Sequence, residues 1–357
     1  LNDEAQANPL GGFDFAFSLP ENANLGYAWI ALEAHGNLGG LSGRRFDHRF
    51  QVQEFRRPEF EVAARNETPG PYFAGGEATV AVEAAYYAGG PLPNAEVTWR
   101  VSTSPSNYSP PNWPDFIFGK WIPWWFAYEP VYIEEGFGGY WPDEQVVEAE
   151  TFSGLTDGSG NHYLNLDFEE TESLQPHSVL AEATVMDVNR QAWAATTSLL
   201  VHPAELYVGL RSERTFVERG QPLEIDIIVT DLDGVPVEDR PVEVQAARME
   251  WRFRQGGWRE EAVDVQECSV GSTKEPVSCT FETALGGEYQ ITAQVTDAYG
   301  RKNESTLTRW VSGGKRPPAR EVEHETVSLI PDRETYQPGD VAELLVQAPF
   351  SPAEGLL

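Results

Sequence analysis

Ala-Thr-Val-Met-Asp at residues 183–187 returns as Ala-Gln-Val-Thr-Asp at residues 293–297, 110 positions further along the chain. In both copies Ala and Val occupy alternate positions, as expected for one face of a half-buried β-strand. A polar turn and a Thr/Ser-rich strand follow each copy, and those strands end at Val201 and Val311, again 110 positions apart. One constant offset across several elements indicates repeated modules of the same architecture.

A second repeated element opens each module. It is a short glycine-containing turn, and an aromatic residue precedes it by three or four positions. In the first two cases an alternating strand follows, then a Gly/Pro turn and a second strand. The three openings are Gly76-Glu77 after Phe73, Gly220-Gln221 after Phe216, and Gly339-Asp340 after Tyr336.

These landmarks divide the chain into successive modules. The expected divisions are the end of one module at residues 1–55, a second module at 56–203, a third at 204–312, a linker at 313–322 and the start of a fourth at 323–357. Modules of about 100 residues with strands every 8–12 residues predict an all-β chain of tandem seven-stranded antiparallel β-sandwiches. The second module exceeds this size because of an insert at residues 103–152. Since the first and last modules are incomplete, we expect a fragment of a longer protein.

The alternation changes phase once, inside the third module. Residues 242, 244 and 246 are apolar in one phase, and residues 249, 251 and 253 are apolar in the other. A one-residue shift turns side chains to the opposite face, so the pattern predicts a β-bulge or a change of sheet at this point.

The net charge of −31 argues against partners that are themselves polyanions. DNA, RNA and anionic lipid headgroups would be repelled. The acidic residues are spread among apolar ones rather than collected in a tail, which is typical of the solvated surface of a large exported protein. Hydrophobic residues make up 41% of the chain, which is enough for sizeable cores.

The chain has two cysteines, Cys268 and Cys279, which flank a stretch containing Gly271 and Pro276. Two strands of one hairpin would place them opposite each other, within bridging distance. This arrangement predicts a disulfide and therefore an oxidising compartment. Two separate buried thiols are the alternative.

The sequence carries no motif expected of an enzyme. The six histidines are scattered without metal-ligand spacing, neither cysteine lies in a CxxC pair, and no GxSxG or phosphate-loop pattern occurs. Residues 231–234 (Asp-Leu-Asp-Gly) slightly resemble a calcium loop, but they lack its downstream ligands and stand where a hairpin turn is needed. We therefore expect no catalytic residues, no metal, no cofactor and no small-molecule substrate.

The insert concentrates aromatic residues. Exposed aromatic faces bind sugars or peptides, so its tryptophans form a candidate interaction surface. The alternative is a small core in which the aromatics pin a long loop to the sandwich, and Pro123 and Pro130 favour it because they stiffen that loop. The five tryptophans are Trp113, Trp121, Trp124, Trp125 and Trp141.

Several segments together resemble bacterial α2-macroglobulin-like proteins. No single motif is highly specific, but the ordered set covers essentially the whole chain. The segments are 50–62 (FQVQEFRRPEFEV), 72–77 (YFAGGE) with 86–87 (YY) and 97–99 (VTW), 118–121 (FGKW), 287–289 (GEY) with 297–300 (DAYG) and 310–313 (WVSG), and 329–332 (LIPD) with 336–340 (YQPGD) and 349–350 (PF).

The resemblance implies a row of macroglobulin domains in an exported protein that is periplasmic, at the cell surface or extracellular. Such proteins trap proteases: a bait segment is cut, the molecule closes, and an internal thioester often captures the attacker. The thioester motif, Cys-x-Glu-Gln, is absent here. The family places both bait and thioester beyond the domain that begins near Glu323.

The function implied by the resemblance is that of a scaffold segment in a broad-spectrum endopeptidase inhibitor. Its partners would be proteases, through the full-length protein, and the neighbouring macroglobulin domains. The alternative is an extracellular β-sandwich adhesion or binding module. It would use the aromatic loop between Trp113 and Trp141 for carbohydrate or peptide.

Overall fold

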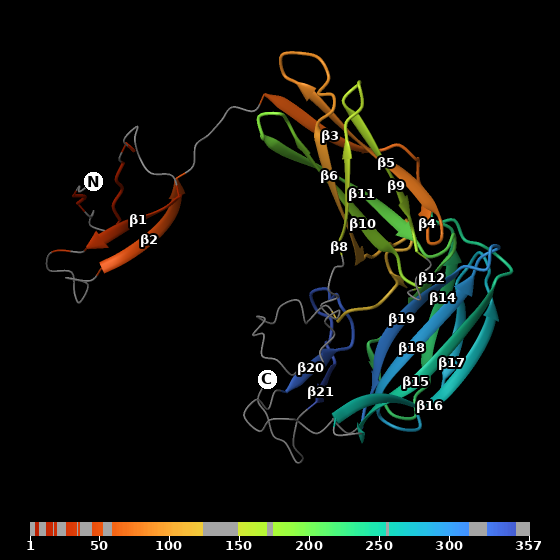
Figure 1. The fold of residues 1–357 in the computed structure, drawn as a ribbon. Helices are drawn as coiled ribbons and strands as arrows, with labels where there is room; N and C mark the ends of the chain where they lie inside the picture. Colours follow the sequence, from red (N-terminus) through yellow and green to blue (C-terminus); the bar gives the residue numbers. More distant parts are fainter. Residues whose placement is uncertain are drawn as a thin grey trace. The chain divides into compact units, whose positions relative to one another are not determined.

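The computed structural model describes residues 4–6, 12–16, 18–19, 26–33, 35, 45–52, 59–123, 149–169, 174–254, 257–313 and 327–347, without the side chains of residues 254, 257 and 258. These residues belong to two compact units, residues 1–59 and 60–357. All regular structure in them is β-strand (Figure 1), which confirms the expected all-β fold class. No helix among the described residues is long and apolar enough to cross a membrane.

The described part of the first unit contains an antiparallel hairpin, β1 (Gly26–Glu33) with β2 (Arg45–Val52). Half-buried and exposed residues alternate along all of β1, as the pleat of a strand with one covered face requires. The guanidinium of Arg49 lies 3.5 Å from the centre of the Tyr27 ring, a cation–π contact between the two strands.

The second unit begins with a sandwich of two sheets. The larger sheet has the strand order β4-β11-β10-β6-β8, and the smaller has the order β3-β5-β9. Apolar side chains from both inner faces form one core, in which Trp99 is fully buried and donates its indole N–H to Nδ1 of His162 at 3.1 Å. The strands are β3 (Phe60–Asn66), β4 (Tyr72–Phe73), β5 (Glu77–Tyr86), β6 (Glu96–Pro105), β8 (Ala149–Leu155), β9 (Asn161–Asp167), β10 (His177–Met186) and β11 (Ala192–His202).

A second sandwich follows in the same unit. Its sheets have the orders β17-β14-β12-β7 and β13-β19-β18-β15-β16. The repeat at residues 183–187 and 293–297 occupies equivalent strands, β10 and β18, each paired with the strand after it. The strands are β12 (Tyr207–Arg211), β13 (Phe216–Val217), β14 (Leu223–Thr230), β15 (Pro241–Arg254), β16 (Gly257–Gly271), β17 (Val277–Phe281), β18 (Gly287–Thr296) and β19 (Lys302–Val311), with β7 (Ile117–Phe118) added from the insert.

A short hairpin of β20 (Ser328–Pro331) and β21 (Leu344–Gln347) packs on the second sandwich. Ile330 is buried in the same core cluster as the strands above it. The Thr215 N–H donates to the carbonyl of Asp332 at 2.9 Å, and the Thr215 hydroxyl donates to the carbonyl of Pro331. This hairpin is therefore part of the second unit.

Among the described residues each sandwich has the expected seven strands of its own, and the first of them is split between the two sheets. β3 lies in the smaller sheet, whereas β4 lies in the larger one and runs parallel to β11. β12 and β13 divide in the same way, with β13 parallel to β19. The aromatic-glycine openings seen in the sequence follow these crossings, at Phe73 and Phe216.

A β-bulge lies beside the phase change in the third module, but on the neighbouring strand β16, so it does not itself change the phase of β15. The register between β15 and β16 shifts between Ala246 and Arg248. Pairing of β15 with β18 continues unbroken past the same residues, so the extra residue lies on β16. Asp264 on β16 has a φ of 51° and accepts hydrogen bonds from Nε and Nη2 of Arg248 at 2.9 and 2.7 Å.

Candidate functional site: an aromatic joint between the two sandwiches

The first part of the insert lies against the next sandwich in the chain. β7 pairs with β12, with Phe118 opposite Gly209. The Gly119 carbonyl then accepts the N–H of Thr306 at 2.9 Å, and the Trp121 N–H donates to the Thr306 carbonyl at 2.9 Å. Because β12 and β19 belong to opposite sheets, residues 117–121 tie both sheets of the second sandwich to the first sandwich.

Aromatic side chains fill this contact. Phe118 is 5% exposed and lies over Gly209, where a Cβ atom would come within 2.7 Å of the phenyl ring. Phe116 is buried beside it, and the Trp113 ring meets the Phe116 ring edge-on at 5.5 Å between centroids. We name the following set the aromatic joint: Tyr108, Trp113, Phe116, Phe118 and Trp121 of the insert, with Tyr207, Ile228 and Leu232 of the second sandwich.

Polar groups of the aromatic joint are satisfied across the contact. The Tyr108 hydroxyl donates to the carbonyl of Leu232 at 2.5 Å, and the Trp113 indole N–H donates to the carbonyl of Gly234 at 3.0 Å. Both acceptors lie in the turn between β14 and β15. Such bonds are directional, so they fix the orientation of the insert on this turn.

Trp121 closes the joint on the side of β19. Its ring is 9% exposed and lies 5.9 Å from the Trp310 ring, at an interplanar angle of 62°. The guanidinium of Arg309 lies 5.1 Å from the centre of the Trp121 ring. Burial lowers the pKa of Arg309 to about 9, and the cation–π contact partly offsets that cost of burial.

A histidine and two tyrosines meet where the first sandwich ends. Nδ1 of His202 and the hydroxyl oxygen of Tyr207 are 2.8 Å apart, and the Tyr108 ring stands edge-on to the His202 ring at 4.8 Å. Burial lowers the pKa of His202 to about 4. Burial, with the nearby Tyr108, raises the pKa of Tyr207 far above its usual range. Both groups are therefore neutral in the folded protein at neutral pH.

A second contact lies beside the joint and centres on Arg301. Its guanidinium stacks on the Phe73 ring of the first sandwich at 4.1 Å. It also pairs with Asp297 at 2.8 Å and with Glu205, in the connection between the sandwiches, at 3.2 Å. Asp297 accepts the backbone N–H of Glu205 at 3.1 Å, so one carboxylate holds both the connection and the arginine.

Gly234→Ala is expected to destabilise the protein more than Gly220→Ala, because Gly234 lies against the insert. Gly234 has a φ of +76°, and a Cβ there would lie 2.0 Å from the carbonyl oxygen of Pro111. Gly220 has a φ of +88° with open space around it, so Gly220→Ala tests backbone strain alone. We expect Gly234→Ala to cost about 2 kcal/mol more unfolding free energy than Gly220→Ala in urea titrations. Equal losses would mean that the turn does not contact the insert.

Stability is expected to fall in acid through His202. The unfolded chain binds a proton near the ordinary pKa of 6.5, whereas folded His202 does so only near pH 4. The contribution is therefore full above pH 6.5 and lost as the pH falls towards 4, by about 2–3 kcal/mol in all. His202→Gln should flatten this part of the stability–pH curve, and His48→Gln, at an exposed position, should not. Parallel curves for wild type and His202→Gln would contradict the prediction.

The structure places two of the five singled-out tryptophans. Trp113 is half-buried and Trp121 is buried, both within the aromatic joint. These two aromatics pack on the sandwich that follows in the chain. The other three, Trp124, Trp125 and Trp141, lie outside the described residues.

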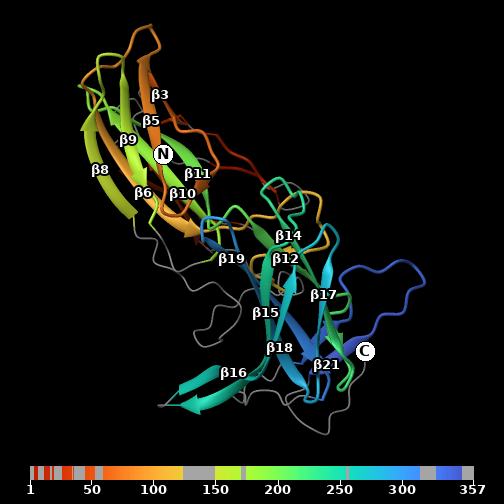
Figure 2. The same ribbon diagram turned by 90° about the vertical axis from the view of Figure 1, so that its right-hand side faces the viewer.

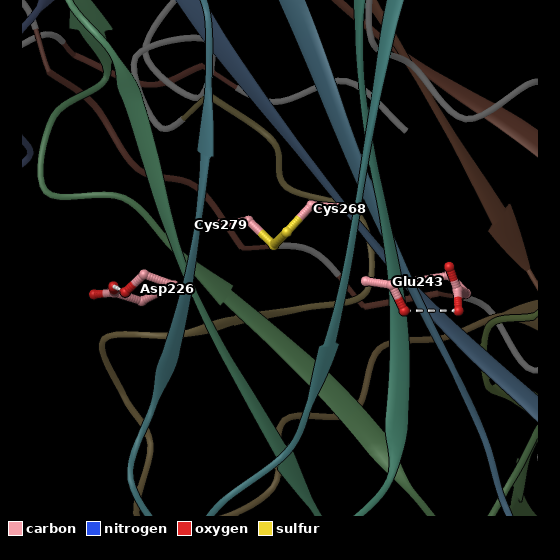
Figure 3. Close-up of a disulfide and its surroundings, with 6 residues drawn as sticks. Asp226, Glu243, Cys268 and Cys279 are labelled. Atoms are coloured by element: carbon pink, nitrogen blue, oxygen red, sulfur yellow. Dashed lines mark hydrogen bonds between the residues drawn. A yellow bond between two sulfur atoms is a disulfide. The ribbon is translucent and has the colours of Figure 1, made fainter.

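Cys268 and Cys279 form a disulfide, with a Cα–Cα distance of 6.2 Å. They do not face each other in one hairpin, because β16 pairs with β15 and β17 pairs with β14. The bond joins the two sheets at one side of the second sandwich (Figure 3). The serine beside each cysteine donates to a carboxylate on the neighbouring strand, at Glu243 (3.0 Å) and Asp226 (2.7 Å).

Asp231 is a turn residue, as the hairpin interpretation has it. Its Oδ1 accepts the backbone N–H groups of Asp233 and Val235 at 3.0 and 2.8 Å. Asp157 and Asp297 stabilise hairpin turns in the same way. Oδ1 of each accepts the backbone N–H groups of the residues two and four positions later in the chain. Within the residues that the structure describes, no group of three His, Cys, Asp or Glu residues is arranged to hold a metal ion.

Comparisons with known proteins give three relatives by sequence, while no protein-family model matches the chain. Over 350 residues, 95% of the chain, it is 21% identical to the alpha-2-macroglobulin homolog of the cyanobacterium Nostoc. Over 234 residues, 66% of the chain, it is 26% identical to alpha-2-macroglobulin of Thermotoga maritima. Over 270 residues, 67% of the chain, it is 27% identical to a Dictyostelium discoideum protein named circularly permutated Ras protein 2. The chain spans 17%, 12% and 6% of these three relatives.

One solved structure supports the fold. The cryo-EM structure of native E. coli alpha-2-macroglobulin matches 98% of the chain with a TM-score of 0.51, at 18% identity and over 23% of that protein. The chain and this structure therefore share the β-sandwich fold. With the two relatives that carry the same name, this match confirms the resemblance to bacterial α2-macroglobulin-like proteins that the sequence segments indicate.

Proposed function

We propose that this chain is a scaffold segment of a macroglobulin-like endopeptidase inhibitor, and that it acts mechanically by holding consecutive macroglobulin domains in place. The observation that carries the proposal is the similarity to the Nostoc alpha-2-macroglobulin homolog along 95% of the chain. The aromatic joint supports it, because a segment of one sandwich is built into the next through hydrogen bonds and buried rings.

The proposal assigns one macroglobulin domain to residues 56–203 and another to 204–312, with parts of two more at 1–55 and 323–357. The connection between the two complete sandwiches is short, from the end of β11 at His202 to the start of β12 at Tyr207. Ala204 and Leu206 in this connection are buried. A buried connection plus a donated strand would transmit a displacement of one domain to its neighbour.

The proposed setting is outside the cytoplasm, in the periplasm, at the cell surface or in the medium. The Cys268–Cys279 disulfide supports this location, because disulfides persist in oxidising compartments. The partners under this proposal are proteases, through the whole inhibitor, and the neighbouring macroglobulin domains. The segment itself performs no catalysis.

The test compares two proteins in protease assays. Residues 1–357 alone are expected to leave trypsin fully active on both azocasein and a small amide substrate. The protein in the length that its gene encodes is expected to protect azocasein but not the small substrate, since a trapped protease keeps its active site. Inhibition by residues 1–357 alone, or no protection by the gene-length protein, would overturn the proposal.

The alternative function, a binding module that uses the aromatic loop, gains no support from the two tryptophans that the structure describes. The Trp113 indole N–H is bonded to Gly234, and the Trp121 ring is covered by Trp310 and Arg309. The Trp121 ring is buried, and Trp113 is half-buried with its one polar group already bonded. Tryptophan fluorescence titrated with glycans is therefore expected to show no shift from these two residues.

A further inference from the structure

At one side of the first sandwich, a histidine joins the two sheets. β9 is an edge strand of the smaller sheet and β8 an edge strand of the larger one, and Figure 2 shows both at the same side of the sandwich, which we call the β8–β9 edge. His162 of β9 lies so close to Gly154 of β8 that a Cβ atom there would overlap the Nε2 atom of the imidazole. Its Nδ1 atom accepts the indole N–H of Trp99, on β6, at 3.1 Å. The imidazole therefore contacts both sheets.

The second sandwich closes the equivalent side with its disulfide. Trp99 and Val244 pair with the alanines that open the two copies of the repeat. Phe152, which is the next partner of Trp99, therefore corresponds to Cys268, which is the next partner of Val244.

The correspondence holds in the other sheet as well. In each sandwich a positive-φ glycine of the opening turn donates its N–H to a carbonyl just beyond an edge strand, that of Phe168 in the first and of Thr283 in the second. Leu164 and Cys279 each lie four residues before that carbonyl, so Leu164 corresponds to Cys279. The first sandwich thus has an apolar pair, Phe152 and Leu164, where the second has the disulfide.

The residues next to these positions differ in chemistry. Gly154 and His162 correspond to Val270 and Val277, which both pack half-buried against the core of the second sandwich. In the first sandwich the glycine leaves room on β8, and the imidazole fills it. One sandwich closes this side with a covalent bond and two valines, and the other with apolar side chains and a titratable ring.

The bond to Trp99 requires a neutral imidazole. An indole N–H can only donate, so Nδ1 of His162 accepts with its lone pair and the proton of the neutral ring is on Nε2. A second proton would go to Nδ1 and end this bond. Trp99 is fully buried, so its N–H would then lack a partner away from water, which destabilises the closed edge. Burial lowers the pKa of His162, so the bond is intact above the ordinary pKa of 6.5 and is lost as the pH falls through the lowered value.

Among the described residues, no charged side chain lies next to His162 on the inner face. Its neighbours there are apolar, namely Val82, Val97, Phe152 and Leu164. Tyr86 and Glu150 share that face, but lie four residues along their strands from Val82 and Gly154. Asp157, in the turn between β8 and β9, accepts backbone N–H groups of that turn. The other charged residues of these strands alternate to the outer face, namely Glu77, Glu83, Glu96, Arg100 and Asp167.

We propose that His162 is an acid-sensitive lock on the β8–β9 edge. The neutral ring holds β9 to β6 through Trp99, and the protonated ring lets β8 and β9 separate locally while both sandwiches stay folded. β8 is the strand by which the chain returns from the insert to the first sandwich, so its release loosens that end of the insert. Acid therefore acts on the first sandwich as a reducing agent acts on the second. The lock is independent of the protease-inhibitor function.

The test follows isotope-labelled residues 1–357 by NMR between about pH 7.5 and 4.5, a range above the pKa of His202 of about 4. The Trp99 indole resonance, identified with Trp99→Phe, is expected to shift with the midpoint of the His162 titration, and that midpoint should lie below 6.5. Across it, the amides of β8 and β9 should exchange with solvent at least about tenfold faster relative to those of β18, which lies in the disulfide-closed sandwich.

Three variants separate the lock from other effects of acid. His162→Gln keeps a hydrogen-bond acceptor but does not titrate, so neither the indole resonance nor the exchange ratio should change with pH. His177→Gln is the matched control, because His177 is half-buried in the same sandwich and burial lowers its pKa, yet the wild-type response should persist. In Phe152→Cys/Leu164→Cys, a disulfide at the positions that the second sandwich uses should keep β8 and β9 protected while His162 still titrates.

The proposal is overturned if the Trp99 resonance does not follow the His162 titration, or if His162→Gln responds to acid as the wild type does. It is also overturned if the resonance shifts while the exchange ratio stays constant, because the β8–β9 edge would then remain closed.

Discussion

Phe118→Ala is expected to lower the free energy of unfolding by about 4 kcal/mol, the usual cost of removing a buried phenyl ring and leaving a cavity. Phe118 is 5% exposed and contributes to a cluster with Phe116, Tyr207 and Ile228. Its partner in β12 is Gly209, which has no side chain to fill the space. We also expect β7 to detach from β12, at the edge of the sheet β17-β14-β12-β7, because the Phe118 ring holds this two-residue strand in place.

Phe253→Ala is the matched control, because it removes the same ring from a position that is 61% exposed. We expect it to cost less than about 0.5 kcal/mol. Urea unfolding followed by circular dichroism measures both losses. Limited proteolysis should cut the Phe118→Ala protein between the sandwiches sooner than wild type. Similar stability losses for the two variants would show that the aromatic joint contributes little.

Reduction of the Cys268–Cys279 bond is expected to cost about 3 kcal/mol, from the loop-closure entropy of a loop of this length. The cysteines are 11 residues apart, and Cys279 is fully buried in the core of the second sandwich. Because β16 and β17 lie in different sheets, opening the bond releases the contact between the sheet edges. Denaturant titrations with and without a reducing agent measure the effect.

Cys268→Ala/Cys279→Ala provides the control for the disulfide. This variant should be destabilised to a similar extent as the reduced protein, and the reducing agent should then have no further effect. A wild-type midpoint that does not move under reduction would contradict the prediction. So would a reducing-agent effect that persists in the double variant.

Much of the fold can be predicted from the sequence, because the pleat of a strand produces an alternation of apolar and polar residues. The repeat at residues 183–187 and 293–297 marks equivalent strands. The phase change after Ala246 lies next to the bulge, but it does not show that the extra residue is on β16. The pattern did not show that the first strand of each sandwich divides between sheets. β4 and β13 are two residues long, too short to carry a period, and their pairing depends on β11 and β19 far along the chain.

The aromatic joint could be predicted only in part. The sequence singled out Trp113 and Trp121, but not the surface that receives them. Two signals were present there. Gly209 interrupts the apolar run at residues 206–210, which often marks a close approach by another segment. Ile228 breaks the alternation of β14, and in the structure both faces of β14 are covered at this point. Neither signal identifies the segment that makes the contact, because the contacting residues are about 90 positions apart or more.

Amide hydrogen exchange at Trp121 and Thr306 tests most directly whether the insert is built into the second sandwich. The Trp121 N–H is bonded to the Thr306 carbonyl, and the Thr306 N–H to the Gly119 carbonyl. We predict that both amides exchange as slowly as those of the β12 core, and that Phe118→Ala speeds their exchange while Phe253→Ala does not. Exchange of the two wild-type amides at the rate of an exposed loop would contradict the aromatic joint and, with it, the proposed coupling of the two domains.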